Sequence, residues 1–263
     1  MIFFMSDYLT TTEAIEKILA EKYAGVSSAA FEADKHRIER GEPWRYVLGY
    51  ADFLDCRIDL SQRPMIPRPE TAFWVQKVIE ECSSNSAQDK KGKGPIKALD
   101  LYAGSGNIGV ALLKHLPQAH VTFSELDEKL LPGIERSIVD SGIDPSRATV
   151  IAGDSLNAIE STRVFDVICA NPPYIDPADE ADLDPEMRHE PHIAFFGSAD
   201  GMAHHRELIE RGREFLSQHG AIYCECDIDQ VPELKRILAT TDWYHEFWKD
   251  PFGHEDVMVL HNS

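Results

Sequence analysis

From residue 96 onward, short apolar runs of strand length alternate with segments that have helical periodicity. Apolar runs bounded by turn residues are typical of strands buried on both faces, and strands that alternate with helices form parallel sheets. The pattern therefore predicts an α/β fold with a doubly wound, seven-stranded and mostly parallel sheet. The predicted strands are 96–102, 120–125, 148–152, 164–170, 221–224, 242–248 and 255–261, and the predicted helices are 107–116, 127–140, 201–217 and 231–239.

The first 71 residues have a different pattern. Thr10 and Glu13 have the spacing of a capping box, and apolar residues at helical spacing follow as far as Tyr23. A second helix is predicted from about Ser28 to Arg40. We therefore expect a small helical domain at 1–42, a hairpin and proline-rich connector at 43–71, and the domain that contains the sheet at 72–263.

Two connecting segments have distinct compositions. Prolines 64, 67 and 69 favour a stiff, extended and packed chain as far as Thr71, from which the next helix is entered. The segment from Ser83 to Pro95 is rich in Ser, Lys and Gly and is predicted to be a flexible surface loop.

Asn171-Pro172-Pro173-Tyr174 follows the apolar run 164–170, which places it at the carboxyl end of a strand, where open α/β sheets bind ligands. Two prolines stop the strand and remove two backbone donors, so nearby carbonyls stay free to accept. The Asn171 side chain adds an acceptor, and Tyr174 adds an aromatic ring. Such a rigid group of acceptors suits a planar NH2 group. Taken alone, the tetrapeptide is equally consistent with a simple strand-ending turn.

A glycine-rich segment joins the first strand of the sheet to its helix. Gly104, Gly106 and Gly109 match the dinucleotide fingerprint, which fits NAD and S-adenosylmethionine equally well. An acid at the end of this strand suits a ligand with an ammonium group, and acids after the next two strands could hold ribose hydroxyls and an adenine amino group. S-adenosylmethionine is therefore favoured. The candidate cofactor-binding residues are Asp100, Tyr102, Ala103, Gly104, Ser105, Gly106, Glu125, Asp154, Ser155 and Asn171.

The charge balance and cysteine content narrow the function classes. The chain has 26 Lys and Arg against 45 Asp and Glu, a formal net charge of −19, which argues against non-specific nucleic-acid binding. The acidic segment 176–190 could steer a basic partner or be a solvated loop. The five cysteines are scattered and indicate reduced intracellular thiols; Cys224-Glu225-Cys226 is interpreted as a strand, and no metal is expected.

Localisation follows from the same features. No apolar run approaches the ~18 residues of a membrane span. The amino terminus has no basic leader and no apolar core of signal-peptide length, so an intracellular protein is expected. His204 and His205 are neighbours on a predicted helix, so they do not face one site and are placed at the surface.

A mechanism follows if the acceptor is a planar amide or an aromatic amine. The lone pair of such a nitrogen is delocalised, so the nitrogen is a poor nucleophile until its surroundings disfavour the conjugation. We expect the Asn171 side chain and the Pro172 carbonyl to accept the two N–H bonds. Tyr174 would pack on the planar group. The candidate catalytic residues are Asn171, Pro172, Pro173 and Tyr174.

Four motifs resemble those of a known family when they are taken in order. They are Pro-Arg-Pro-Glu-Thr at 67–71, Asp-Leu-x-x-Gly-Ser-Gly at 100–106, Asn-Pro-Pro-Tyr at 171–174 and Arg-x-Glu-Pro at 188–191. The combination resembles the HemK/PrmC family of N5-glutamine methyltransferases, which modify the Gly-Gly-Gln loop of peptide chain release factors. Asn-Pro-Pro-Tyr alone is shared with adenine-N6 methyltransferases, so specificity rests on its combination with Pro-Arg-Pro-Glu-Thr.

The resemblance implies a class I, Rossmann-like methyltransferase fold, S-adenosyl-L-methionine as cofactor and a release factor as protein partner. Three positions depart from the family pattern: Ala72 where Glu is usual, Tyr102 where Gly is usual, and Glu125 where Asp is commoner. We expect Ala72 at the wall of the acceptor pocket and Tyr102 to narrow the methionine end of the cofactor pocket. The implied substrate-binding residues are Arg68, Glu70, Asn171, Pro172, Pro173 and Tyr174.

Two other functions remain open at this point. One is an adenine-N6 methyltransferase on DNA or RNA, which the net charge of −19 disfavours. The other is a non-catalytic module that keeps the cofactor fold. We expect a monomer that acts in the mitochondrion if its substrate is an organellar release factor, and in the cytoplasm otherwise.

Overall fold

A seven-stranded sheet forms the centre of the molecule, and its strand order confirms the predicted α/β fold. The computed structural model describes residues 9–88 and 94–262. In this part of the chain the strand order is β5-β4-β3-β6-β7-β9-β8, and β9 runs antiparallel to the other six strands. The strands are β3 (Lys97–Leu101), β4 (His120–Glu125), β5 (Ala148–Ala152), β6 (Phe165–Ala170), β7 (Leu216–Glu225), β8 (Tyr244–Lys249) and β9 (Glu255–His261).

Alternating side chains of the strands face two separate hydrophobic cores. Ala98 and Val167 belong to one core, whereas Leu99 and Ile168 belong to the other. Three helices cover the first face, α4 (Pro69–Gln88), α5 (Asn107–His115) and α6 (Leu131–Asp140). Two helices cover the second face, α7 (Ala203–Arg211) and α8 (Val231–Leu238). Because both faces are covered, the central strands are apolar runs, which is why the sequence pattern predicted them.

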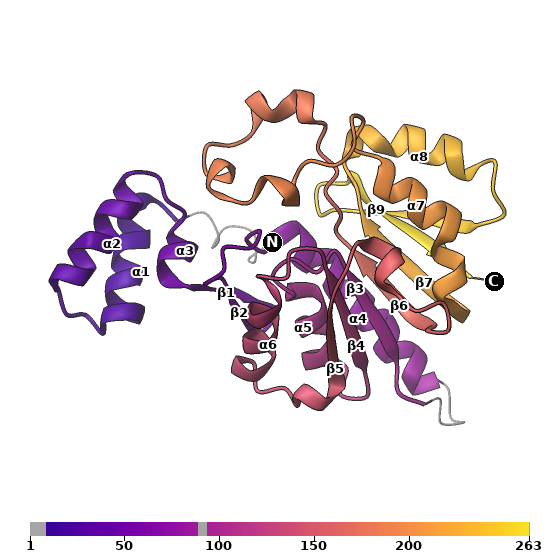
Figure 1. Ribbon diagram of the computed structural model, residues 1–263, viewed down its shortest axis with the longest axis horizontal. Coiled ribbons are helices and arrows are strands. Elements are labelled where there is room, and N and C mark those ends of the chain that lie inside the picture. The colour runs from indigo at the N-terminus through magenta and orange to yellow at the C-terminus, as the bar shows by residue number, and fades with distance from the viewer. Residues whose placement is uncertain (1–8, 89–93, 263) are drawn as a thin grey trace.

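The amino-terminal helices form a cap with its own small core, which includes Ile18, Phe31 and Val47. Figure 1 shows this cap, in indigo, projecting to one side of the sheet. A two-stranded hairpin follows the cap and packs against α6 through β2. The elements are α1 (Thr11–Tyr23), α2 (Ala29–Glu39), α3 (Trp44–Leu48), β1 (Tyr50–Phe53) and β2 (Cys56–Asp59).

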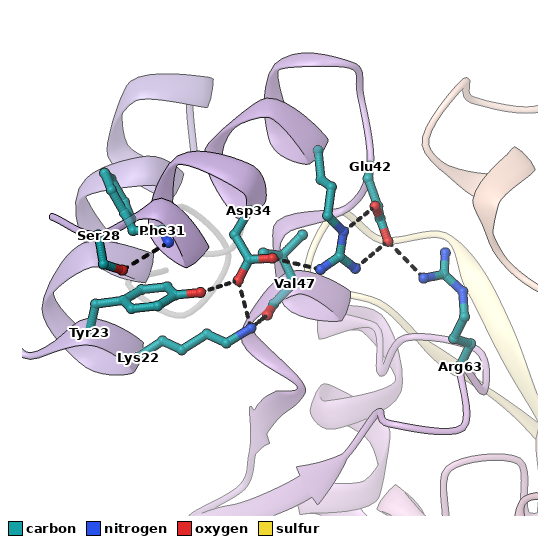
Figure 2. A network of polar contacts seen from close by, with 9 residues as sticks. Lys22, Tyr23, Ser28, Phe31, Asp34, Glu42, Val47 and Arg63 are labelled. Carbon is teal, nitrogen blue, oxygen red and sulfur yellow. Dashed lines mark hydrogen bonds and ion pairs between the residues drawn. The ribbon is translucent and has the colours of Figure 1, made fainter.

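A chain of ion pairs joins the cap helices to the segment after the hairpin (Figure 2). Lys22 Nζ lies 2.7 Å from Asp34 Oδ2, and Arg37 contacts both Asp34 and Glu42. Arg63 Nη1, beyond the hairpin, lies 2.7 Å from Glu42 Oε1. We call these five residues the cap network. It connects α1, α2 and the loop after α2 to residue 63, at the entrance to the proline-rich connector.

Several predicted boundaries were wrong. Residues 44–48 form α3 instead of a strand, because they lie between Pro43 and the left-handed Gly49 and pack three apolar side chains into the cores. Helix α4 starts inside the predicted connector, at Pro69, a residue suited to a first helical position because it needs no partner for an N–H.

Two further boundaries also differ. Helix α4 continues to Gln88, so the predicted loop is helical in its first part. The helix predicted at 201–217 ends at Arg211, and β7 begins at Leu216. A Cβ on Gly212 would lie 2.4 Å from Ile222, so the chain passes too close to the sheet here for a continuous helix of larger residues. The predictions for residues 1–7 and 89–93 lie outside the described residues. Within the described residues, no helix has the length and apolarity needed to cross a membrane.

Candidate active site

Strand register brings the predicted site residues together at one edge of the sheet. Leu101 of β3 pairs with Ala170 of β6, and Ala170 pairs in turn with Cys224 of β7. Because these strands are parallel, the residues that follow each pair emerge side by side. Tyr102, Asn171 and Glu225 are therefore neighbours, although they lie far apart in the sequence. The connection reverses direction between β3 and β6, which makes this edge a topological switch point.

The Asn171–Tyr174 turn is held by a segment that precedes α7. The Ile175 N–H donates to the Phe195 carbonyl over 2.8 Å, and the Gln230 side chain donates to the Tyr174 carbonyl over 2.9 Å. Gly201 has φ of 65°, and a Cβ there would lie 2.0 Å from the Tyr174 carbonyl oxygen. Only glycine fits this close approach, which fixes the turn from behind.

Asn171 Oδ1 and the Pro172 carbonyl have no hydrogen-bond partner among the described residues. The other end of the Asn171 amide, Nδ2, lies 3.4 Å from Thr71 Oγ1 at the start of α4. Pro172 itself is buried. The pair of free acceptors is the feature that the sequence predicted for a planar NH2 group.

Glu225 lies behind the turn and binds three donors. Its Oε2 accepts from Thr71 Oγ1 at 2.7 Å and from Trp74 Nε1 at 2.8 Å, and its Oε1 accepts from the Tyr174 hydroxyl at 3.2 Å. Burial raises the pKa of Glu225, and the three hydrogen bonds oppose that rise. The strand interpretation of the Cys-Glu-Cys segment is confirmed for Cys224 and Glu225, which end β7.

A cavity of about 360 Å³ opens in front of the turn. We call it the acceptor cavity. Of the predicted catalytic and substrate-binding residues, Arg68, Glu70, Asn171, Pro172 and Tyr174 line it. Pro173 does not line this cavity. A Cβ on Gly197 would lie 2.6 Å from the Pro173 carbonyl oxygen, so Pro173 packs against the segment that precedes α7.

The wall of the acceptor cavity joins two of the recognised motifs. Arg68 Nη2 lies 2.6 Å from Glu190 Oε1, and Glu190 Oε2 accepts from the Ile66 N–H at 2.8 Å. The Glu190 side chain is 1% exposed. Burial raises its pKa, and the Arg68 guanidinium opposes that rise. This partly buried ion pair fixes the connector against the segment that follows the Asn171 turn.

The predicted cofactor loop lies on the other side of Asn171. Gly104 has φ of 54°, and the nearest atom to a Cβ there would be the Tyr102 carbonyl oxygen at 3.9 Å, so the backbone faces open space. Glu125 Oε2 accepts from the Gly104 N–H at 2.7 Å, and its Oε1 accepts from the Asp127 N–H. Glu125 therefore shapes this loop directly, and each carboxylate oxygen keeps a lone pair for another donor.

Asp100 lies deeper than the sequence suggested. It is fully buried, and its Oδ2 accepts from the Gly109 N–H in the first turn of α5 at 2.8 Å. Its Oδ1 has no hydrogen-bond partner among the described residues. Burial raises the pKa of Asp100 well above its usual value. Gly109 is required here because a Cβ would lie 2.2 Å from the Phe123 ring and 2.9 Å from Asp100 Oδ2.

The other predicted cofactor residues support the same loop. Ala103 and Ser105 are buried, and the Ala103 N–H donates to the Ser124 carbonyl. Gly106 has φ of 75° and precedes α5 as its cap residue. Asp154 is exposed next to buried Ser155.

Tyr102 is fixed by polar groups beneath the loop. Its hydroxyl lies 2.6 Å from Ser155 Oγ, which donates to Glu207 of α7. The His204 ring packs on Tyr102 with centroids 4.7 Å apart. Residues after β3 and after β5 are thereby joined to α7.

The prediction that His204 and His205 lie at the surface is wrong. His205 is fully buried, and its Nε2 lies 3.0 Å from the Glu225 carbonyl oxygen. Burial lowers the pKa of His205 to about 4, so the ring is neutral near pH 7 and Nε2 carries the hydrogen. The reason is that His205 shares a helix face with Leu208 and Ile209, which pack on the sheet.

A second cavity of about 1030 Å³ lies between the cap, the hairpin and α4. Arg68 lines both cavities. Ala72 lines this larger cavity and not the acceptor cavity, so the expectation that it forms the acceptor wall is wrong. Thr71 and Ala72 are consecutive in α4, so their side chains point in different directions around the helix, Ala72 toward the hairpin and Thr71 toward Glu225.

Sequence reasoning missed a set of residues that support the site. Glu190 and Thr71 belong to the recognised motifs, so their motif membership was an available signal. Glu225 ends a predicted strand, and strand ends at this edge are where ligands bind. Trp74 and Gln230 gave no signal before the structure was known. The missed residues are Thr71, Trp74, Glu190, Glu225 and Gln230.

Comparisons with known proteins identify the family. The family model of the methyltransferase small domain matches residues 87–187. A release factor glutamine methyltransferase of Agrobacterium fabrum is 32% identical over 235 residues, which cover 89% of this chain and 79% of that protein. Another, of Deinococcus radiodurans, is 30% identical over 213 residues, which cover 81% of this chain and 72% of that protein. The chain belongs to the release factor glutamine methyltransferase family.

Solved structures agree with the fold of this family. The N-terminal domain of human METTL16, solved in complex with SAH, superposes with a TM-score of 0.55 at 12% identity and covers 99% of this chain and 96% of that domain. At this identity the likeness shows the fold alone. It confirms the predicted class I methyltransferase fold, and the curated relatives confirm the predicted family.

One departure from the release factor glutamine methyltransferase pattern has a physical cost. Tyr102 adopts φ of 59°, in the left-handed region that favours glycine, the residue usual there. The hydrogen bond from its hydroxyl to Ser155 and the packing of its ring on His204 offset that strain. Its ring lies partly within the core beneath the loop.

Proposed function

We propose that this member of the family uses S-adenosyl-L-methionine to methylate the side-chain amide nitrogen, N5, of glutamine in the Gly-Gly-Gln motif of a peptide chain release factor. The two free acceptors beside the acceptor cavity, Asn171 Oδ1 and the Pro172 carbonyl, carry the proposal. A primary amide has two N–H bonds to match them. The relatives that share most of the chain are named for the same activity.

The loop after β3 suits this cofactor. Gly104 exposes backbone to open space, where a ligand can approach closely. The buried Asp100 Oδ1 lacks a partner, and an ammonium group near the loop would offset its charge. Glu125 and Asp154 have free lone pairs for hydroxyl and amino donors. When bound, S-adenosyl-L-methionine supplies an activated methyl group on a sulfonium.

The residues of the chain prepare the acceptor nitrogen. Asn171 Oδ1 and the Pro172 carbonyl each accept one N–H of the substrate amide and stabilise the positive charge that develops as the nitrogen attacks. Because prolines fix the turn, these acceptors need no reorganisation. Tyr174 packs on the planar amide and keeps its lone pair directed toward the methyl group.

The two cavities suit a polypeptide substrate. The acceptor cavity, at about 360 Å³, has room for one side chain, and the cavity of about 1030 Å³ beside the cap has room for a longer segment. Arg68 lies where they meet. With a net charge of −19, the protein would attract a basic partner and repel nucleic acid.

Transfer from labelled cofactor tests the substrate. Incubated with a release factor, the protein should label the glutamine of Gly-Gly-Gln, which mass spectrometry of the peptide would locate. A release factor with Gln replaced by Glu is the matched control and should stay unlabelled. Label that enters only DNA or RNA would replace the proposal by adenine-N6 methylation, and no label anywhere would favour a non-catalytic module.

Two substitutions separate the substrate side from the cofactor side. Asn171→Ala should lower kcat by about 10²–10³-fold while cofactor affinity stays largely intact, because Asn171 is assigned chiefly to the substrate amide. Asp154→Ala should weaken cofactor affinity about tenfold, measured by calorimetry. The division is wrong if Asn171→Ala loses cofactor affinity in proportion to its activity.

We infer that the protein acts as a monomer inside the cell, in the cytoplasm or, if its substrate is an organellar release factor, in the mitochondrion. A single copy contains both cavities and every site residue named above, which supports the monomer. Light scattering of the purified protein tests the monomer, and a carboxyl-terminal fluorescent tag in the native cell tests the compartment.

A further inference from the structure

A chain of hydrogen bonds behind the acceptor cavity ends on Asn171. Trp74 Nε1 and Thr71 Oγ1 both donate to Glu225 Oε2, over 2.8 Å and 2.7 Å, and Asn171 Nδ2 lies 3.4 Å from Thr71 Oγ1. The first three residues are buried, at 1%, 2% and 6% exposure for Trp74, Thr71 and Glu225. The last contact is long, as catalytic hydrogen bonds commonly are before substrate binds.

The chain has a fixed direction because it starts at an indole. An indole N–H can only donate, so Glu225 must present an unprotonated oxygen to Trp74. Thr71 shares that oxygen and must direct its O–H toward it. The Thr71 hydroxyl then has only lone pairs left, so the Asn171 amide must turn its NH2 end toward Thr71. The conclusion follows from donor identity and does not depend on telling nitrogen from oxygen in the amide.

The direction decides what the acceptor cavity can bind. With its NH2 on Thr71, Asn171 presents Oδ1 to the cavity, where it accepts an N–H. Rotated by half a turn, the same amide would present donors to the NH2 of the substrate and repel it. A side-chain carboxylate has no N–H to donate and would face Oδ1 as a second acceptor.

We propose that Trp74, Glu225 and Thr71 are positioning residues that fix the Asn171 amide as an acceptor and so select a primary amide over a carboxylate. The inference deepens the proposed function and rests on it, since that function assigns Asn171 to the substrate amide. Thr71 and Trp74 do not line the acceptor cavity, and Glu225, which does, is assigned a role through Thr71 and not a contact with the reacting atoms.

Thr71 offers the first test, because Val matches its shape without the hydroxyl and Ser keeps the hydroxyl. Thr71→Val should lower kcat about 10–100-fold with the KM for release factor and the cofactor dissociation constant unchanged. Thr71→Ser should return kcat to within about threefold of the wild type. Wild-type kcat in Thr71→Val, with its melting temperature retained, would overturn the proposal.

Glu225 and Trp74 offer a second test that a structural role alone would not pass. In Glu225→Gln, the indole N–H holds the new amide with its oxygen toward Trp74, so the chain keeps its direction. In Trp74→Phe, the carboxylate still accepts from Thr71, and the direction is kept again. Each single variant should therefore lose less kcat than the double variant.

The double variant removes both constraints. With no indole donor, the Gln amide is free to turn its NH2 toward Thr71, and the Thr71 O–H is free to turn toward Asn171. We expect kcat to fall about 10–100-fold. This value of kcat is far lower than the one expected if the effects of the two single substitutions multiplied. Multiplicative effects would overturn the proposal.

A measurement without substrate separates this inference from the proposed function. The side-chain amide resonances of Asn171, followed by NMR in the ligand-free protein, should shift toward those of an unbonded amide in Thr71→Val and stay in place in Thr71→Ser. Unchanged resonances in Thr71→Val would overturn the proposal. If the wild type fails to label a release factor, the proposed function fails, and these resonances still decide the direction of the chain.

Discussion

Two glutamates of this molecule have similar numbers of hydrogen-bond partners and opposite electrostatics. Glu42 in the cap network binds two arginines, which lower its pKa to about 2. Glu225, which lines the acceptor cavity, binds three uncharged donors, and burial raises its pKa. The charge of the partner and the access of water therefore set the pKa of a carboxyl more than the number of its hydrogen bonds does.

The two regions also use their carboxylates differently. The cap network joins helices across a surface where both arginines remain more than one-third exposed, at 41% for Arg37 and 44% for Arg63. Solvent screens such pairs, so each adds little stability. Glu225 is enclosed, so its contacts fix orientation, and losing them leaves buried donors unpaired.

Removing Glu225 should have the largest effect. Glu225→Ala leaves the Thr71 hydroxyl, the Trp74 indole and the Tyr174 hydroxyl without their acceptor, and we expect about 3–5 kcal/mol of lost unfolding free energy. Urea denaturation at pH 7 measures it. The matched change in the cap, Glu42→Ala, should cost about 1 kcal/mol. Equal losses at the two positions would show that burial does not distinguish Glu225 from Glu42.

A pH series on Glu42→Gln should have an intermediate effect. The folded pKa of Glu42, about 2, lies below its unfolded value near 4.5, so its contribution is full above about pH 4.5 and is lost as the pH falls toward 2. We expect the free energy of unfolding of the wild type to exceed that of Glu42→Gln by about 1 kcal/mol near neutral pH. The difference is small because solvent screens the exposed arginines. The difference in urea stability should shrink between those pH values. If the difference in urea stability grows as the pH falls, the pKa of Glu42 is raised by folding instead of lowered.

Arg63→Ala should have the smallest effect. It removes the ion pair with Glu42 and the stacking of the guanidinium on the Tyr46 ring, whose centroid lies 4.3 Å from Arg63 Cζ. The free energy of unfolding should fall by less than about 1 kcal/mol. Arg63→Lys keeps the charge and serves as its control. Both variants should keep wild-type kcat, because the cap network lies outside the acceptor cavity. If kcat changes in Arg63→Ala and not in Arg63→Lys, the charge at residue 63 affects the active site and the two regions are energetically coupled.

The sequence predicted the sheet better than the cap. The buried strand β4 matches the predicted 120–125, and β6 begins one residue after the start of the predicted 164–170, because strands covered on both faces are continuous apolar runs. The short helix α3 was missed, because five residues carry too little periodicity to separate a helix from a strand. His205 was misplaced because its neighbour and its polarity suggested the surface, whereas the face it shares with Leu208 decided its burial.

The candidate site also contains residues that the sequence predicted and residues that it did not. The acceptors at 171 and 172 and the glycine loop were predicted, because each is a local motif with its own chemistry. The residues that hold those acceptors were not, because Thr71, Asn171 and Glu225 come from three separate elements. No local pattern relates them.

The type of fold, the family and the groups that accept hydrogen bonds follow from patterns within short stretches of chain, so they could be predicted from the sequence. The direction in which the acceptors face could not, because it depends on contacts between distant segments. Strand register sets Asn171 beside Glu225, and helix α4 brings Thr71 and Trp74 to the same carboxyl. Hydrogen-bond direction is a property of such a network, because each donor limits what its neighbour can do.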